Sequence, residues 1–421
     1  MTENKMTINV GNDTGNSTCK VSFENQNGGF DRILIPSVIA KKGTSDNLEP
    51  ISAEGNALEA YLDGLLDNLD VSIDSSSLED SGRYGRYLIG NAAVTSGMRK
   101  TDFDVNDPKG KSDQDLTVIL NLALIAGRAV QDFYRENKEL PNHIDVDANL
   151  VTALPIAEGK EPNRLKAYRN KYVNDDSHTV LIKNFKNTIS VSIHFNDVII
   201  PLEGETPEYA IQHSLDLDPK LAESITKDFN HNYPQFKDQV TTTQLINPDV
   251  PVLNIDLGEG TVDFSVFNAD GSININASSS LKEGYGNYLE LAIDDLSRKG
   301  DTFNSRESLH QFMDQETSIF NRQRKEGIQS TIDERMTQFC DSIAVELKKV
   351  MKTVDGNVGM IYVYGGGSIP LAKPLREKIN TTTAKFVSVP PVTVFIDKKY
   401  ARVLNEIGLE MILNSVFLNN K

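Results

Sequence analysis

The most informative segment of this 421-residue chain is Leu253-Asn254-Ile255-Asp256-Leu257-Gly258-Glu259-Gly260-Thr261-Val262-Asp263-Phe264-Ser265-Val266-Phe267. Its pattern is that of two strands joined by a tight turn. Apolar residues run into the turn, and on the way out Val262, Phe264 and Val266 alternate with polar residues. We therefore expect a β-hairpin here.

The turn of this hairpin has the composition of an anion-binding loop. Glycines let backbone N–H groups approach an anion closely, because no Cβ intervenes. The carboxylates of Asp256 and Asp263 flank the turn and would repel a bare phosphate, so a Mg²⁺ between carboxylate and phosphate is expected. The turn residues are Gly258, Glu259, Gly260 and Thr261.

A second segment near the N-terminus has the same design, Ile8-Asn9-Val10-Gly11-Asn12-Asp13-Thr14-Gly15-Asn16-Ser17-Thr18-Cys19-Lys20-Val21. An apolar strand again runs into Asp-x-Gly, small polar residues and a further strand. Either segment alone is also compatible with an ordinary hairpin closed by an Asx-Gly turn. Together they favour two similar halves that face each other across one site.

Composition limits the class of protein. The length allows two domains with their own cores. The net charge of −17 disfavours direct binding to nucleic acid or to an anionic membrane, although it is equally compatible with plain solubility. Cys19 and Cys340 show no metal or disulfide spacing, and the N-terminus has no apolar signal core, so a cytoplasmic location is expected. The apolar run 116–126 is expected to be too short to span a bilayer.

Several element boundaries follow from local signals. Ser112-Asp113-Gln114-Asp115 resembles a capping box that opens a helix through about Asn137. Period-two patterns predict further strands, and a single helix is expected to end the chain. The predicted strands are Ile189–Phe195, Val198–Ile200 and Asn274–Leu281, and the helices run from Ala372 to Asn380 and from Lys398 to Phe417.

The two hairpins resemble the phosphate loops of the actin superfamily. Asp13-x-Gly15-x-x-x-x-Lys20 is similar to the first loop, and Asp256-x-Gly258-x-x-Thr261-x-Asp263 to the second. A third segment, Ile361-Tyr362-Val363-Tyr364-Gly365-Gly366-Gly367-Ser368, is similar to the adenosine motif, an apolar strand that ends in three glycines and Ser or Thr. On its own, that triplet is also compatible with a plain strand-to-helix loop. The three motifs occur in the order found in the family and span most of the chain.

The resemblance implies an α/β, actin-like two-domain fold of duplicated ribonuclease-H-like domains around a nucleotide cleft. Each domain would hold a mixed five-stranded sheet with helices. Domain I would be residues 1–245, with a core formed by 1–40 and 112–245 and an inserted subdomain at 41–111. Domain II would be residues 246–421, with a core formed by 246–290 and 350–395 and an inserted subdomain at 291–349. The terminal helix 396–421 would pack back on domain I.

The resemblance also implies a site for ATP and Mg²⁺. Backbone N–H groups around Gly15, Asn16, Ser17 and Thr18, and around Glu259, Gly260 and Thr261, would hold the β- and γ-phosphates. Lys20 would place its charge on a phosphate oxygen, or it is a solvated strand lysine. Asp13 and Asp256 would hold Mg²⁺ through water, and Asp256 is also expected to be catalytic. The segment from Gly365, Gly366 and Gly367 to Ser368 would bind adenosine, with Gly284-Tyr285-Gly286 on the ribose side.

Hydrolysis also needs a group that orients water on the γ-phosphate. Leu154-Pro155-Ile156-Ala157-Glu158 is similar to the Leu-Pro-x-x-Glu of the prokaryotic ParM-like plasmid-segregation actins, which makes Glu158 the catalytic candidate. Glu158 is alternatively a loop glutamate or a helix cap near Lys160. The fingerprints of P-loop ATPases and of dinucleotide-binding folds are absent from the sequence.

The family resemblance implies an ATPase that polymerises head-to-tail into filaments, weakened by hydrolysis. Such a protein segregates plasmid DNA through a basic DNA-binding adaptor on the plasmid centromere, without direct contact to nucleic acid or membrane. The alternative that the residues leave open is a non-filamentous small-molecule kinase or ATP-dependent sensor on the same fold.

Overall fold

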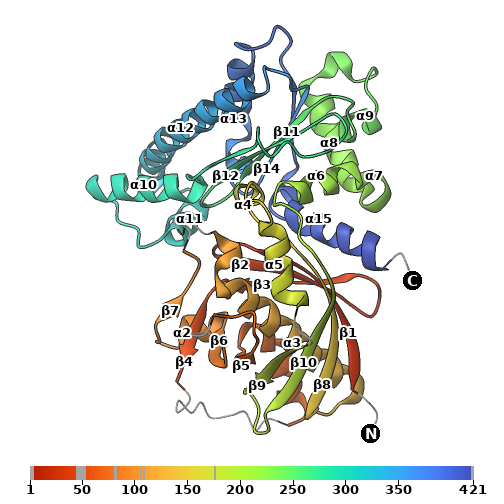
Figure 1. Ribbon diagram of the computed structural model, residues 1–421. Coiled ribbons are helices and arrows are strands. Elements are labelled where there is room, and N and C mark those ends of the chain that lie inside the picture. Colours follow the sequence, from red (N-terminus) through yellow and green to blue (C-terminus); the bar gives the residue numbers. More distant parts are fainter. Residues whose placement is uncertain are drawn as a thin grey trace. The chain divides into compact units, whose positions relative to one another are not determined.

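The computed structural model describes residues 4–43, 54–79, 83–104, 107, 110–174 and 177–418. Internal contacts divide the chain into unit 1, Met1–Thr206 with Glu406–Lys421, and unit 2, Pro207–Asn405 (Figure 1). The domain assignment drawn from the sequence, with its boundary at residue 245, stays a prediction. Parts of the expected insert 41–111, namely 44–53, 80–82, 105–106 and 108–109, lie outside the described residues.

Unit 1 is built on one ten-stranded sheet of order β3-β2-β1-β8-β10-β9-β5-β6-β4-β7. The five-stranded mixed sheet expected for the first domain is the part β3-β2-β1-β8-β10, in which β1 pairs antiparallel with β2 and parallel with β8. The sheet continues because β10 pairs with β9, and β9 with β5 from the expected insert. The strands are β1 Lys5–Thr14, β2 Thr18–Glu24, β3 Phe30–Pro36, β4 Ile39–Lys42, β5 Asp70–Asp74, β6 Gly85–Ile89, β7 Lys100–Thr101, β8 His143–Thr152, β9 His178–Ile182 and β10 Ile189–Ile199.

Strand β10 corrects one prediction. The sequence suggested two strands, Ile189–Phe195 and Val198–Ile200, but the structure has a single strand that crosses the gap. Its register against β8 shifts between Phe195 and Asp197. Such a bulge inserts an extra residue into one strand, which breaks the period-two pattern without ending the strand.

Helix α3, Asp115–Asn137, is the central helix of unit 1 and is buried along most of its length. By length and composition α3 could cross a membrane, so the expectation that this apolar run is too short was wrong. Within the protein, however, 89% of its apolar window is buried, as in the core helix of a globular domain. The other helices here are α1 Asn56–Asp63, η1 Leu65–Asp67, α2 Asn91–Thr95, η2 Lys111–Asp113, α4 Ile156–Gly159 and α5 Arg164–Val173.

The predicted capping box at the start of α3 is wrong. The N-cap residue is Gln114, and no side chain caps it. Ser112 belongs instead to the short turn η2, where its backbone N–H donates to the carboxylate of Glu158 at 2.9 Å. A distant carboxylate thus caps this turn.

Unit 2 is built on a five-stranded sheet of order β13-β12-β11-β14-β15, in which β11 pairs antiparallel with β12 and parallel with β14. The strand predicted over 274–281 is confined to its last three residues, because Asn274 forms a turn: its side chain accepts from the Ala277 N–H at 3.1 Å. The strands are β11 Val252–Leu257, β12 Val262–Phe267, β13 Ser279–Leu281, β14 Met360–Tyr364 and β15 Val392–Phe395.

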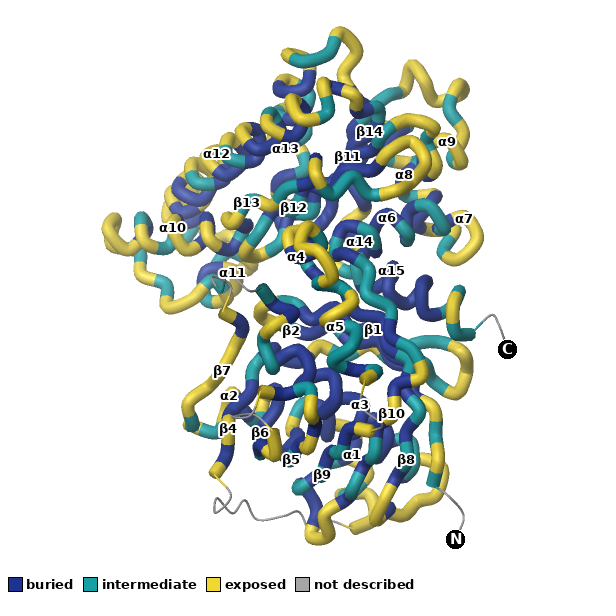
Figure 2. Tube along the Cα trace, in the orientation of Figure 1, coloured by how far each residue is buried: buried dark blue, intermediate teal, exposed yellow. Residues whose placement is uncertain are grey.

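Helices α10, α12 and α13 pack with this sheet in one apolar core, and their outer faces are exposed (Figure 2). Helix α13 begins at Ser368, directly after the glycine triplet, and not at Ala372 as predicted. The helices of this part are α7 Ser214–Leu217, α8 Pro219–Asn232, η3 Pro234–Phe236, α9 Thr242–Ile246, α10 Tyr285–Arg298, α11 Arg306–Asp314, α12 Arg322–Thr353, α13 Ser368–Thr383 and α14 Lys398–Ala401. Two further helices cross the division between the units: α6 Glu205–Gln212 runs from unit 1 into unit 2, and α15 Leu404–Leu413 begins in unit 2 and lies mostly in unit 1.

The single terminal helix predicted from Lys398 to Phe417 is also wrong. Helix α14 ends at Ala401, α15 begins at Leu404, and Asn414–Leu418 form a π-helical turn. The break has a local cause, since the carbonyl of Ala401 accepts from the Gly365 N–H at 2.9 Å. That carbonyl is therefore engaged by the glycine triplet at the place where a continuous helix would use it.

Candidate functional site

The hairpin between β11 and β12 in unit 2 has the predicted form. Asp256 pairs with Asp263, and Leu257 with Val262, in an antiparallel register. The Gly258 N–H donates to the carbonyl of Thr261 at 3.0 Å and closes the turn. Glu259 and Gly260, at the tip of the turn, are exposed. The tip of the turn is therefore accessible from solvent.

The end of β14 lies against this hairpin because β14 runs parallel to β11. Gly365 has φ +87°, and a Cβ there would lie 2.5 Å from the carbonyl oxygen of Leu257 and closer still to Asp256 Oδ1. The Gly367 N–H donates to the carbonyl of Leu257 at 3.0 Å, and Ser368 donates its hydroxyl to the Gly365 carbonyl at 2.8 Å. Gly366 is half-buried, with room for a side chain. The second loop and the glycine triplet thus form one backbone cluster.

Residues 284–286 join the same cluster. The Tyr285 N–H donates to the Gly258 carbonyl at 3.0 Å, and the Gly286 N–H to the Glu259 carbonyl at 2.9 Å. A Cβ at Gly284 would overlap the Glu259 carbonyl. The structure therefore brings all three glycine-bearing segments together, while the ribose contact itself stays a prediction.

Polar side chains fix the carboxylates of this cluster. Asn405 Nδ2 donates to Asp256 Oδ2 at 3.0 Å, and Thr261 Oγ1 donates to Asp263 Oδ2 at 2.9 Å. Glu259 forms an ion pair with Arg306, which also lies 3.6 Å from the carboxylate of Glu290. The guanidinium offsets the negative charge of Glu259 at the place where phosphates are expected.

A cavity of about 540 Å³ opens between helices α10, α11, α12 and α13. It adjoins the glycine cluster, because its wall includes Tyr285 and a Cβ at Gly367 would lie 2.9 Å from the Tyr285 Cβ. Its lining is mainly apolar, with His310, Gln329, Asp333 and Thr337 as polar groups. A planar aromatic ring fits such a lining.

Ser37 stabilises the turn of the N-terminal hairpin in unit 1 by two hydrogen bonds. Ser37 donates its hydroxyl to the Gly15 carbonyl at 2.7 Å and its N–H to the Ser17 carbonyl at 3.0 Å. A Cβ at Gly15 would lie 2.6 Å from the Thr18 carbonyl oxygen, so only glycine fits this turn. Asn16 and Ser17 are exposed and Thr18 is half-buried. Within the described residues, the buried Thr14 Oγ1 has no hydrogen-bond partner, as expected of a group that bonds to a ligand or to water.

Two lysines contribute positive charge to this side of unit 1. Lys20 Nζ lies 3.2 Å from Asp13 Oδ2 and the side chain is partly exposed, so its role in phosphate binding stays a prediction. Lys111 is buried and lies 3.0 Å from Glu203 Oε1. Burial lowers the pKa of Lys111, but the carboxylates of Glu203, Asp13 and Glu158 outweigh burial and raise that pKa above its ordinary value. The three carboxylates therefore favour the charged form of Lys111.

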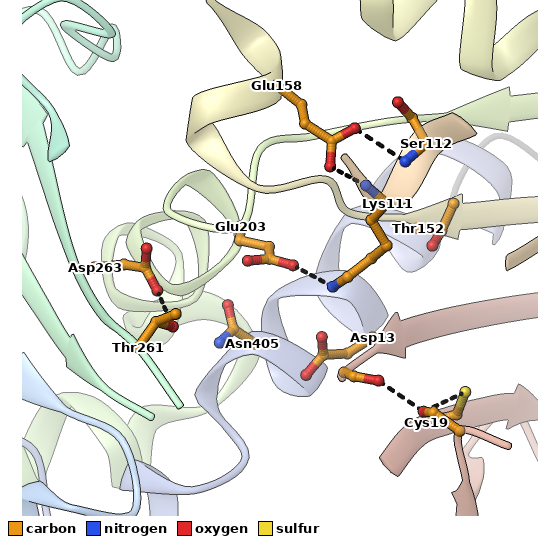
Figure 3. A network of polar contacts seen from close by, with 12 residues as sticks. Asp13, Cys19, Lys111, Ser112, Thr152, Glu158, Glu203, Thr261, Asp263 and Asn405 are labelled. Carbon is orange, nitrogen blue, oxygen red and sulfur yellow. Dashed lines mark hydrogen bonds and ion pairs between the residues drawn. The ribbon is translucent and has the colours of Figure 1, made fainter. Parts of the chain in front are cut away.

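Glu158 lies in α4 and is buried. Its Oε1 accepts from the Lys111 N–H at 2.8 Å and its Oε2 from the Ser112 N–H at 2.9 Å (Figure 3). Gly110, at φ +81°, leaves room for this carboxylate, since a Cβ there would lie 2.6 Å from its carboxyl carbon. Glu158 thus caps η2, a turn distant in sequence, and each oxygen keeps one lone pair for a further hydrogen bond.

Among the described residues, no group of three or more His, Cys, Asp or Glu side chains is arranged to hold a metal ion. Asp13 and Asp256 supply one carboxylate each. A carboxylate oxygen is a ligand type that suits Mg²⁺, which keeps part of its water shell and takes other oxygens from phosphates.

The sequence analysis missed four residues of these clusters: Ser37, Lys111, Glu203 and Arg306. Ser37 follows Pro36 at the end of β3, and nothing in the sequence places it under Gly15. Lys111 lies in a polar segment with no periodicity. Arg306 is the one missed residue for which the sequence holds a signal. Glu259 is a charged residue within a glycine-rich turn, and this position indicates that a cation lies nearby.

Two family models match the sequence. The model of the N-terminal domain of actin-like proteins matches residues 11–205, and that of the C-terminal part of the archaeal MreB-like actin homologue matches residues 254–377. The fold and the two glycine-rich hairpins thus define an actin-fold protein. The chain belongs to the actin-like proteins of the actin superfamily. No curated protein matches the sequence.

Solved structures of actin-like proteins resemble the whole chain. The actin-like protein Alp7A superposes with a TM-score of 0.65 at 17% identity, covering 99% of this chain and 98% of the other. ParM of Bacillus thuringiensis, solved with ATP, gives a TM-score of 0.57 at 16% identity and covers 96% and 98%. An archaeal actin homologue gives 0.58 at 16% identity and covers 97% and 99%. At these identities the likeness establishes the fold.

Proposed function

We propose that this protein binds ATP with Mg²⁺ and hydrolyses it as an actin-like cytomotive ATPase. The observation that carries the proposal is the glycine cluster of unit 2, where Gly365 lies against Asp256 and three glycine segments share backbone hydrogen bonds. The N-terminal hairpin, with the orphaned hydroxyl of Thr14 and the tight turn at Gly15, supports a second set of phosphate contacts. The ParM relative was solved with ATP, which supports the same ligand.

In this proposal, different residues bind the phosphates, the metal and the base of ATP. The turns 15–18 and 259–261 donate backbone N–H groups to phosphate oxygens, and Lys20 adds a point charge. Asp13 and Asp256 would hold Mg²⁺ through water, and the metal would neutralise part of the phosphate charge. The cavity beside Tyr285 takes the base, with Gln329 and Asp333 as hydrogen-bonding groups.

For hydrolysis we propose that Glu158 orients the attacking water. Its carboxylate is held by the N–H groups of Lys111 and Ser112, so its position is fixed before any substrate arrives. The remaining lone pair on either oxygen accepts a hydrogen bond from water.

We further propose that the protein polymerises head-to-tail with itself in the cytoplasm and segregates plasmid DNA through a DNA-binding adaptor. The relatives Alp7A and ParM support this family role. The net charge of −17 supports a basic adaptor as the link to DNA, since direct binding to the phosphate backbone would be repulsive.

The experiment is sedimentation at high speed with phosphate release measured in the same samples. With ATP and Mg²⁺, the protein is expected in the pellet and phosphate is expected in solution. Addition of EDTA is expected to prevent both. A protein that binds ATP but stays in the supernatant, and transfers phosphate to a small acceptor, would instead be a kinase or sensor on this fold.

A further inference from the structure

The loop between α11 and α12 presents two adjacent apolar side chains to solvent. Ile319 is 80% exposed and Phe320 is 92% exposed, and Phe320 has the highest value among the large hydrophobic residues that the structure describes. Single exposed apolar side chains are common on protein surfaces, but two neighbours on one projecting loop indicate a binding element. We refer to Ile319 and Phe320 as the apolar knob.

The knob stands on an ordered base. The buried Lys325 donates from Nζ to the carbonyl of Met313 at 2.8 Å and to that of Gln315. The Ser318 N–H donates to Asn321 Oδ1 at 2.7 Å, which closes the turn around the knob. A loop held in one conformation loses little conformational entropy when it binds.

A groove of about 490 Å³ lies on another face of unit 2, between α7, α8 and α9. Leu215, Pro219 and Ala222 give it apolar walls. Asn230 also lines it, and within the described residues its Oδ1 is buried without a hydrogen-bond partner. A backbone N–H of a docked segment would satisfy that oxygen. We refer to this site as the α8 groove.

The knob and the groove lie on opposite sides of unit 2. Figure 1 shows α10 and α11 on one side of the sheet β11–β12–β14, and α7, α8 and α9 on the other. A knob on one side cannot reach the groove of its own unit. Two different surfaces on opposite sides of one molecule can join copies only head-to-tail, which gives an open and extendable chain.

We propose that the apolar knob of one copy of this chain docks into the α8 groove of a second copy. Charge favours the match: segment 314–322 carries Asp314, Glu316 and Arg322, a net charge of −1, while the groove carries Lys227 and Lys237 against Glu223, a net charge of +1. The groove volume also accommodates one aromatic and one aliphatic side chain. The inference rests on the proposed function, because it names the contact by which the filament grows.

The first arm of the test measures assembly. Phe320→Ser removes the larger side chain of the knob without touching the core, and Leu215→Arg places a charge on the apolar wall of the groove at a position that is 39% exposed. Each variant alone is expected to raise the concentration needed for ATP-dependent pelleting roughly tenfold to a hundredfold, the change expected from losing one buried aromatic contact. The matched control is Val389→Ser, which removes a side chain that is 81% exposed elsewhere in unit 2. Mixed together, the two variants retain one intact knob and one intact groove, so dimers but no pellet are expected.

The second arm detects the contact directly and without ATP. Ile319→Cys on one copy and Glu223→Cys on another are mixed and treated with a short thiol cross-linker, and a covalent dimer is expected. The native thiols do not interfere, because burial raises the pKa of Cys19 to about 12 and that of Cys340 to about 11. Each variant alone serves as the control.

The outcomes distinguish the proposed contact between the apolar knob and the α8 groove from the proposed ATP-dependent filament. Normal pelleting of Phe320→Ser together with no cross-link would overturn the knob contact and leave the ATP-dependent filament standing. A cross-link in a protein that never pellets with ATP would support the contact and contradict the proposed function. Wild-type protein that never pellets with ATP, together with no cross-link between Ile319→Cys and Glu223→Cys, would overturn both.

Discussion

Gly365 lies against Asp256, so closely that a Cβ at position 365 would collide with the Asp256 carboxylate. The two residues end the neighbouring parallel strands β14 and β11. The glycine triplet therefore positions the carboxylate that is proposed to hold Mg²⁺, in addition to any role in binding adenosine.

Gly365→Ala tests this relationship. The residue has φ +87°, which costs a side chain about 1–2 kcal/mol, and the collision with Asp256 adds to that cost. We expect ATP affinity, measured by titration calorimetry, to fall roughly tenfold or more. Gly327→Ala, in helix α12, is the control, because a Cβ there meets no atom within 4 Å, and its affinity should match the wild type. Equal affinities for both variants would contradict the structural role of Gly365.

Glu158→Ala is expected to lower phosphate release by roughly a hundredfold while ATP-dependent assembly persists, because water would lose its orienting carboxylate. The same change leaves the N–H groups of Lys111 and Ser112 without a partner and so should also lower the melting temperature. Glu158→Gln keeps an acceptor for one of the two N–H groups and should be the more stable variant. Glu161→Ala, at an exposed position three residues later, is the control. Unchanged phosphate release in Glu158→Ala would show that the residue is only a cap.

Arg306→Ala should weaken ATP binding several-fold at low salt, because Glu259 then faces the phosphates with its charge unopposed. The loss should shrink as salt is raised, since both side chains are partly exposed. The double variant Arg306→Ala with Glu259→Gly should recover the wild-type affinity. If the double variant binds as weakly as the single one, Arg306 acts through something other than Glu259.

These positions also show which features could be predicted from the sequence and which could not. Both hairpins and the glycine triplet were predictable, because Asp-x-Gly turns and the alternation around Phe264 are local signals. The continuation of the first sheet was not, since β9 meets β5 by a pairing between segments far apart in the chain. The local pattern predicted that Ser112 opens a capping box for the helix that follows, whereas in the structure Ser112 lies in η2 and its N–H donates to Glu158 through a long-range contact. Lys111 carries no local signal at all, because its role depends on carboxylates from three other elements.

The buried side chain of Glu208 should make the stability of the folded protein depend on pH. Burial raises the pKa of this carboxyl to about 7, although Asn254 and Gln212 donate hydrogen bonds to it. The folded protein therefore holds a proton that the unfolded chain releases near its ordinary pKa of 4.5. The protonation of Glu208 therefore contributes to the free energy of unfolding. The contribution is complete below about pH 4.5, decreases as pH rises through about 7, and is absent at higher pH. The total change in the free energy of unfolding is on the order of 3 kcal/mol.

Glu208→Gln removes the titrating group and keeps a side chain of the same size. We expect its melting temperature, relative to the wild type, to be higher at pH 8 than at pH 5. The control is Glu223→Gln, an exposed glutamate of the same unit, whose difference from the wild type should not depend on pH in this window. A pH-independent difference for Glu208→Gln would mean that Glu208 stays ionised in the folded protein.

The most direct test of the central claim is calorimetric titration of ATP with Mg²⁺ into the wild type, Asp13→Ala and Asp256→Ala. Asp13 belongs to the hairpin of unit 1 and Asp256 to that of unit 2. The account predicts one ATP per wild-type chain and a marked loss of affinity in each variant, because both hairpins serve the same ligand. Wild-type protein that binds no purine triphosphate, or variants that bind as tightly as the wild type, would contradict it.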